Sequence, residues 1–375
     1  MDLLDIKLLL AEKLGDDCVI ADAEMSSYCS FRCGGRADLL VTAENMDALR
    51  YILYVTAGAE VIFGGFAGGK DATFCSSGHC CEKRMCASCE KEKQHGRNKE
   101  SFESLSPEKH GICSLCEKKK AKAMPEVMVL GNGSNILVQD GGYRGIIIKL
   151  GDGFTEVRRS GRYITAGAAA SLSTVAKEAA RCGLSGLAFA NGIPASCGGA
   201  VFMNAGAYGS EMKEVVQSVK AISRDGLREY LADNSELEFS YRHSLFAESG
   251  DIITEVTFAL TEEDPAVIEQ EMRLLSEKRS AKQPLQYPSA GSFFKRPDGH
   301  FAGALIEEAG LKGLSVGGAQ ISPLHAGFIV NTGGATASDV TALMCLVQNT
   351  VYDRSGIMLM PEVQIIGEAL PDGEL

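Results

Sequence analysis

The chain has 375 residues, of which 45% are hydrophobic and 23% charged, a composition typical of a globular protein with more than one domain. Its net charge of -12 argues against general nucleic-acid binding, which requires a basic surface. No apolar run reaches transmembrane length, and residues 1–15 have neither the basic leader nor the cleavage site of a signal peptide. We therefore expect a cytoplasmic protein with reduced cysteines.

Residues 1–56 begin with a helical pattern, which is followed by a strand over 36–41 and a helix over 47–54. The pattern changes over 58–124, which is rich first in glycine and then in cysteine and lysine. Residues 75–123 hold 11 Lys and Arg against 7 Glu, a balance of +4 within a chain of net charge -12. We interpret 58–124 as an insertion with its own chemistry.

Seven of the 13 cysteines lie in this insertion, and four of them form two CxxC pairs separated by 23 residues. These four are Cys86, Cys89, Cys113 and Cys116. Four thiolates at this spacing are typical of a zinc ribbon, and zinc could supply the folding free energy that so polar a segment lacks. An iron–sulfur cluster, a thiol redox switch and a metal-free reduced loop are the alternatives. The nearby lysines could contact RNA or an acidic partner, or could simply be solvated.

After the insertion, the sequence predicts strands over 127–130 and 136–138, joined by the loop GNGSN at 131–135. A Rossmann fingerprint would open a helix at this point, so we reject that fold. A glycine turn between two strands can still direct successive amide groups at a diphosphate. A plain hairpin turn explains the loop about equally well. A strand over 145–150 and a helix over 172–182 follow.

Residues 183–209 contain seven glycines and no charged residue. Glycine loses the most backbone freedom on folding, so such a density is expected where the main chain must closely approach another group. We interpret this stretch as a cofactor cradle built from main-chain amides, with a packed glycine-rich turn as the alternative.

Three polar residues stand out in the rest of the chain, where we expect short strands over 213–260 and a charged helix over 264–281. Arg242 follows an aromatic residue and could bind a carboxylate or phosphate, although a lone arginine is more often a surface residue. Ser292 lies in a tight turn without the GxSxG elbow of a hydrolase, and could donate a proton to a carbanion. Glu362 enters an apolar strand, where it would either need a partner or lie at a solvated edge.

In chain order, the motifs GNGSN, GIPASCGGAVFMNAGAYG, YRHSLF, QPLQYPSAGSFFKRP, AGALIEEAGLKG, GGAQISPLHAGFIVN and PEVQIIG resemble those of the UDP-N-acetylenolpyruvoylglucosamine reductase (UDP-N-acetylmuramate dehydrogenase) family. The resemblance covers about residues 26–56 and 126–368. It implies an α+β protein with a vanillyl-alcohol-oxidase-type (PCMH-type) FAD-binding fold of two subdomains and a C-terminal α+β substrate-binding domain. The implied parts are 1–57 with 125–150, 151–262 and 263–368.

The resemblance also implies a reaction of peptidoglycan synthesis. NADPH reduces FAD, and the flavin N5 then gives a hydride to the enolpyruvyl methylene carbon of UDP-N-acetylglucosamine enolpyruvate. Ser292 would donate the proton to the adjacent carbon, while Arg242 and Glu362 would polarise the substrate carboxylate. The implied substrate-binding residues are Tyr241, Lys295 and Arg296. The implied FAD-binding residues are Gly131, Asn132, Gly133, Ser134, Asn135, Gly192, Ile193, Pro194, Gly198, Gly199, Ala200, Asn204, Ala205 and Gly206.

The chain departs from the family pattern at several positions. Cys29 and Cys33 stand where the family usually has Thr and an aliphatic residue, Ala195 where it usually has Gly, and Ala188 where it usually has Glu. The six cysteines outside the insertion are expected to be small buried or half-buried residues.

Two other functions remain in competition with the reductase. The first is another FAD oxidoreductase of the same fold, such as a sugar or lactone oxidase, although an oxidase needs no proton donor like Ser292. The second is a zinc- or redox-sensing scaffold protein in which the insertion recognises an unknown partner.

Overall fold

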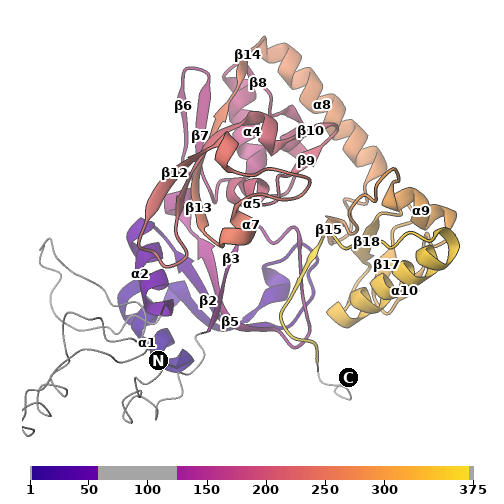
Figure 1. Ribbon diagram of the computed structural model, residues 1–375, viewed down its shortest axis with the longest axis horizontal. Helices are drawn as coiled ribbons and strands as arrows, with labels where there is room; N and C mark the ends of the chain where they lie inside the picture. Colours follow the sequence, from indigo (N-terminus) through magenta and orange to yellow (C-terminus); the bar gives the residue numbers. More distant parts are fainter. Residues whose placement is uncertain (1, 58–124, 371–375) are drawn as a thin grey trace, which may run out of the picture. The chain divides into compact units, whose positions relative to one another are not determined.

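The computed structural model describes residues 2–57 and 125–370 (Figure 1). The insertion with Cys86, Cys89, Cys113 and Cys116 lies outside the described residues, so its zinc-ribbon interpretation stays a prediction. Within the described ranges, no helix is long and apolar enough to cross a membrane. Three larger sheets and three hydrophobic cores organise this part of the chain.

The first sheet has the strand order β1-β2-β5-β3, in which β1 is antiparallel to β2 and the other pairs are parallel. Apolar residues of β5 alternate between its two faces. Ile146 and Ile148 pack with helices α1 and α2, whereas Ile147 joins the core on the opposite face. The elements are α1 (Leu3–Leu14), β1 (Val19–Glu24), β2 (Arg36–Ala43), α2 (Met46–Thr56), β3 (Glu126–Leu130), β4 (Ile136–Val138) and β5 (Tyr143–Leu150), with 3₁₀ turns at Asp16–Cys18 and Met25–Ser27.

The second sheet is antiparallel, with the strand order β12-β11-β13-β7-β6. Helix α4 packs against it, since Val175 and Ala179 share a core with Val219 and Val256 of the sheet. Its strands are β6 (Val157–Ser160), β7 (Tyr163–Gly167), β11 (Val216–Ile222), β12 (Glu229–Asp233) and β13 (Ile252–Ala259). Around it lie α4 (Leu172–Arg181), β8 (Leu184–Ser185), α5 (Cys197–Phe202), β9 (Gly206–Ala207), β10 (Ser210–Glu211), α6 (Met212–Val215), α7 (Phe246–Ser249), β14 (Thr261–Glu262) and 3₁₀ turns at Asp152–Phe154, Ala188–Gly192 and Asn234–Glu236.

Helix α8 (Pro265–Lys282) leads to the third sheet, which has the strand order β15-β18-β17-β16. Helices α9 and α10 lie beside this sheet in Figure 1. Its elements are β15 (Ser289–Ser292), α9 (Ala302–Glu308), β16 (Ser315–Val316), β17 (Ala319–Ile321), β18 (Phe328–Asn331) and α10 (Ala337–Ser355). The expected part boundaries near residues 150 and 262 stay predictions.

The last strand, β19 (Gln364–Ile366), pairs in parallel with β4. The Gln364 amide donates a hydrogen bond to the Asn135 carbonyl over 3.0 Å. Because Glu362 lies two residues before β19, this pairing brings its backbone close to the loop 131–135 that precedes β4.

The six cysteines outside the insertion were expected to be at least half-buried. Cys29, Cys33 and Cys197 are buried, and Cys18 and Cys182 are half-buried. The expectation is wrong for the sixth, which is exposed on α10. The buried residues of that helix, Val340, Leu343, Val347 and Val351, follow a spacing of three or four, and Cys345 falls on the opposite face.

Candidate active site

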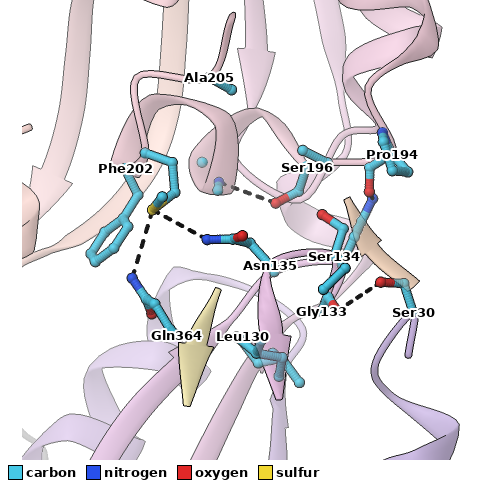
Figure 2. Close-up of a pocket in the computed structure, with 18 of the residues that line it drawn as sticks. Ser30, Leu130, Gly133, Ser134, Asn135, Pro194, Ser196, Phe202, Ala205 and Gln364 are labelled. Carbon is cyan, nitrogen blue, oxygen red and sulfur yellow. Dashed lines mark hydrogen bonds between the residues drawn. The ribbon is translucent and has the colours of Figure 1, made fainter. Parts of the chain in front are cut away.

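A cavity of about 1620 Å³ is lined by the loop 131–135, by the glycine-rich segments 192–199 and 205–207, by α8 and by β15. In Figure 2, Gly133, Ser134 and Asn135 lie opposite Pro194 and Ser196. The two segments are in contact, since the Asn132 side chain donates a hydrogen bond to the Pro194 carbonyl over 3.4 Å.

The loop 131–135 presents main-chain donors to this cavity. Within the described ranges, the amide groups of Asn132, Gly133 and Ser134 donate no hydrogen bond. Gly133 has a φ of +62°, a left-handed conformation that turns successive amide groups toward the same side. Unsatisfied amides at a cavity wall are a suitable donor set for a diphosphate, so this loop fits the FAD diphosphate that the sequence predicts there.

The packing around position 133 also requires glycine, because there is no room for a side chain. A Cβ at this position would overlap the Tyr28 carbonyl oxygen, which lies directly against it, and would lie 2.8 Å from the Cys29 Cα. We expect Gly133→Ala to lower FAD affinity at least tenfold, because alanine adds about 1–2 kcal/mol of left-handed strain and also displaces the loop. Fluorescence titration of the apoprotein with FAD measures the affinity.

The matched control is Gly161→Ala. Gly161 has a similar φ of +59°, but no atom lies within 4 Å of an added Cβ. This variant should show the strain alone and retain wild-type FAD affinity. Equal loss of FAD affinity in the two variants would show that contact with Tyr28 is unimportant.

The glycine-rich stretch forms the opposite wall through α5 and the turn before it. The Ser196 hydroxyl caps α5 by accepting a hydrogen bond from the Gly199 amide over 3.2 Å (Figure 2). A Cβ at Gly131 would lie 2.7 Å from the same hydroxyl, so the two loops approach closely because Gly131 has no side chain. The predicted residues of this wall that line the cavity are Gly192, Ile193, Pro194, Gly198, Gly199, Ala205 and Gly206.

Two predicted cofactor residues do not line the cavity. Ala200 and Asn204 are almost fully buried beneath the wall. The Asn204 side chain donates to the Ser240 carbonyl and accepts from the Lys213 amide, each over 2.9 Å. Asn204 therefore supports the turn that positions the wall.

Arg242 and Glu362 form an ion pair in the cavity. Their Nε and Oε1 atoms are 2.6 Å apart, and the two side chains are 20% and 12% exposed. Arg242 has a φ of +56° in a tight turn, where the main-chain groups of Ser240 and His243 bond each other. A non-glycine residue held in this conformation is a frequent feature of functional sites.

Ser292 lines the same cavity at the end of β15. The Glu362 amide donates to the Phe293 carbonyl over 2.8 Å, and the Lys295 amide donates to the Met360 carbonyl over 2.8 Å. These bonds place the Ser292 and Glu362 segments next to each other. The structure therefore brings the three predicted catalytic residues to one cavity.

The predicted substrate-binding residues are placed differently. The Tyr241 hydroxyl lies 3.5 Å from Glu362 Oε2 and accepts a hydrogen bond from the Arg296 amide over 3.1 Å. The side chains of Lys295 and Arg296 are exposed and do not line the cavity, and the Arg296 guanidinium lies over the Phe301 ring at 4.7 Å. Their role in substrate binding stays a prediction.

Sequence reasoning missed Arg279, which enters the cavity from α8. A Cβ at Gly192 would lie 2.7 Å from its Cδ. Burial lowers the pKa of Arg279, and within the described ranges no acid or hydrogen-bond acceptor pairs with its guanidinium. The sequence around it, EKRSAK, is typical of a solvated helix face and gives no signal of this position.

The chain is similar to proteins of one known family. Residues 283–366 match the family model for the UDP-N-acetylenolpyruvoylglucosamine reductase C-terminal domain, and residues 111–229 match the FAD binding domain model. The reductase of Agathobacter rectalis is 49% identical over 275 residues, which cover 70% of this chain and 87% of that protein. The reductase of Lactobacillus delbrueckii subsp. bulgaricus is 49% identical over 243 residues, covering 64% of this chain and 81% of that protein.

A solved structure is also similar. The crystal structure of UDP-N-acetylenolpyruvylglucosamine reductase from Thermus caldophilus superposes with a TM-score of 0.66 at 31% identity, covering 93% of this chain and 98% of that one. The expected PCMH-type FAD-binding fold is confirmed. Since both domain models match in chain order and the identity to a full-length relative is high, the chain belongs to the UDP-N-acetylenolpyruvoylglucosamine reductase family of FAD-binding oxidoreductases.

Proposed function

We propose that this protein is an NADPH-dependent reductase that converts UDP-N-acetylglucosamine enolpyruvate to UDP-N-acetylmuramate for peptidoglycan synthesis in the cytoplasm. The observation that carries the proposal is that Ser292 and the Arg242–Glu362 pair line one cavity with the loop 131–135, where three main-chain amides donate to no described residue. Family membership supports the same assignment.

The main chain would hold most of the cofactor. The amides of Asn132, Gly133 and Ser134 would bind the FAD diphosphate, and the glycine-rich wall over 192–206 would accommodate the isoalloxazine ring. The chemistry that FAD supplies when bound is hydride transfer from NADPH to the methylene carbon of the enolpyruvyl group.

Arg242 binds the substrate carboxylate. Its Nε donates to Glu362 and its Nη2 donates to the Gly206 carbonyl over 3.4 Å, which leaves Nη1 to face the ligand. Hydride addition to the methylene carbon places negative charge on the adjacent carbon and its carboxylate, and the guanidinium stabilises that charge in a partly dry site. The Ser292 hydroxyl then donates its proton to this carbon and is reprotonated from solvent, which completes the reduction of the double bond.

The experiment is anaerobic flavin reduction by NADPH, followed by mixing with UDP-N-acetylglucosamine enolpyruvate. We expect rapid reduction, slower reduction by NADH, and reoxidation that depends on the enolpyruvyl substrate and yields UDP-N-acetylmuramate. Reduced flavin that reacts with oxygen but not with this substrate would contradict the proposal and favour an oxidase of the same fold.

We make a separate proposal for the insertion over 58–124, which is that it binds zinc. Within the described ranges, no group of three His, Cys, Asp or Glu side chains could hold a metal ion. We assign a structural zinc ion to the insertion cysteines Cys86, Cys89, Cys113 and Cys116 on their spacing alone. Elemental analysis of the purified protein and of the Cys86→Ser/Cys89→Ser variant tests the assignment, and a wild-type protein without zinc would overturn it.

A further inference from the structure

Ser30 bonds two segments that are far apart in the sequence. Its amide donates to the Gly133 carbonyl over 3.0 Å, and its hydroxyl lies 2.6 Å from the Ser289 carbonyl. The hydroxyl also lies 3.4 Å from the Gly133 carbonyl (Figure 2). A hydroxyl has one proton to donate, so the shorter contact with Ser289 is the hydrogen bond. The amide of Ser30 therefore holds the loop 131–135, while its hydroxyl holds β15.

The turn that carries Ser30 is fixed from several sides. The Arg32 amide donates to the Cys29 carbonyl over 3.2 Å, and the Cys29 thiol donates to the Cys33 carbonyl over 3.3 Å. From β18, the Asn331 side chain donates to the Phe31 carbonyl over 3.0 Å. Burial raises the pKa of Cys33 to about 12, which keeps this thiol protonated and unreactive. The turn that carries Ser30 is therefore held by hydrogen bonds within it and from β18.

The ladder with β18 holds β15 at its two ends, where Ser289 pairs with Val330 and Ser292 with Phe328. Its pairing with β18 is irregular between Ser289 and Ser292, and Gly291 has a φ of +77°. The ladder alone therefore does not fix the peptides just before Ser292. On the other side of Ser292, the Phe293 ring packs edge-on against Phe31 of the same turn, with ring centroids 6.3 Å apart.

From these contacts we propose that Ser30 is a positioning residue, which transmits the position of the FAD-diphosphate loop to Ser292 through Ser289. The proposal rests on the proposed function, because it assigns Ser292 to the half-reaction with the enolpyruvyl substrate. Reduction of the flavin by NADPH requires the same loop but no proton from Ser292. Loss of the Ser30 hydroxyl should therefore slow one half-reaction selectively.

The test is stopped-flow measurement of both half-reactions in Ser30→Ala holoenzyme. We expect reoxidation by UDP-N-acetylglucosamine enolpyruvate to slow at least tenfold, since an ångström of misplacement can cost about a hundredfold in rate, while reduction by NADPH stays within about twofold. Ser30→Thr, which retains a hydroxyl, should recover most of the rate. Ser30→Cys has a side chain of similar shape but only a weak hydrogen-bond donor, so its reoxidation by the enolpyruvyl substrate should also be slow. This variant replaces Ser30→Ala in the test if the alanine variant does not fold.

Ser355→Ala is the matched control, because its hydroxyl also donates to a carbonyl, that of Val351 over 2.8 Å, but lies outside the cavity. It should leave both half-reactions unchanged. Equal slowing of both half-reactions in Ser30→Ala, or no slowing in either, would overturn the proposal.

Hydrogen exchange supplies a readout that does not depend on turnover. In Ser30→Ala holoenzyme, a peptide spanning 286–295 should exchange faster than in wild type, while a peptide spanning 131–135 exchanges as in wild type. Unchanged exchange over 286–295 would show that the Ser30 hydroxyl does not hold β15 in place. If the wild-type flavin reacts with no enolpyruvyl substrate, the proposed function fails, but this exchange comparison still tests the contact.

Discussion

Replacing Ser292 with alanine is expected to slow the transfer of reducing equivalents to UDP-N-acetylglucosamine enolpyruvate by about 10²–10⁴-fold, the usual contribution of a general acid. Reduction of the flavin by NADPH should stay within about twofold, because that step needs no proton donor at the substrate carbon. The site geometry supports this separation: Ser292 lies at the end of β15, beside the segment of Glu362, and lines the cavity.

Single-turnover absorbance of the flavin measures both steps in the same preparation. Ser315→Ala is the matched control, since Ser315 lies in the same sheet on β16 and does not line the cavity. A Ser292→Ala enzyme that reduces the enolpyruvyl group at the wild-type rate would remove Ser292 from the mechanism and leave solvent as the proton source.

Much of the fold could be predicted because local patterns determine it. The sequence predicts a strand over 145–150, and β5 covers Tyr143–Leu150. The helix expected over 47–54 behind Asn45 is α2, and the Asn45 side chain caps it by accepting from the Ala48 amide over 2.9 Å. Capping and periodicity act within a few residues, so a single sequence reveals them.

The pairing of β19 with β4 could not be predicted in this way. It joins Gln364 to Ile136, residues that are remote in the sequence, and it has no local signature. This pairing places Glu362 in the cavity, so the sequence alone left open whether that carboxylate was solvated or partnered. The order of the motifs suggested its role through a family resemblance, and the ion pair with Arg242 explains how it is accommodated.

The direction of individual side chains at the site also depends on contacts that a single sequence does not reveal. The composition of the glycine-rich run predicts a cofactor cradle, but α5 turns Ala200 inward, and the Asn204 side chain donates to the Ser240 carbonyl. Arg279 and Ser30 were missed because their contacts come from distant segments. Composition therefore located the wall of the cavity, while the direction of each side chain depends on tertiary packing.

Breaking the Arg242–Glu362 ion pair is expected to reduce both stability and activity. Arg242→Met should lower the free energy of unfolding by about 3–5 kcal/mol, because it leaves a largely buried carboxylate without its partner. It should also slow the reaction with the enolpyruvyl substrate by about 10³-fold, since an unpaired Glu362 would repel the substrate carboxylate in a partly dry site. Chemical denaturation of the holoenzyme and single-turnover kinetics measure the two effects.

Glu362→Gln should lower the free energy of unfolding less than Arg242→Met does. The Gln amide oxygen can still accept a hydrogen bond from the Arg242 Nε–H group, which lies 2.6 Å from the carboxylate in the wild type. Arg36→Met is the matched control: Arg36 pairs with Asp22 and Glu24, but its side chain is 51% exposed, so its loss should cost about 1 kcal/mol or less.

The double variant Arg242→Met/Glu362→Gln, compared with the two single variants, shows whether the two side chains stabilise the fold as a pair or independently. Removing both charges leaves no buried ion without a partner, so this variant should be more stable than Arg242→Met alone. Its activity should remain low, because the guanidinium that binds the substrate carboxylate is still absent. Stability losses that simply add in the double variant would show that the two side chains do not stabilise each other, and the pair would then have to be treated as two separate residues.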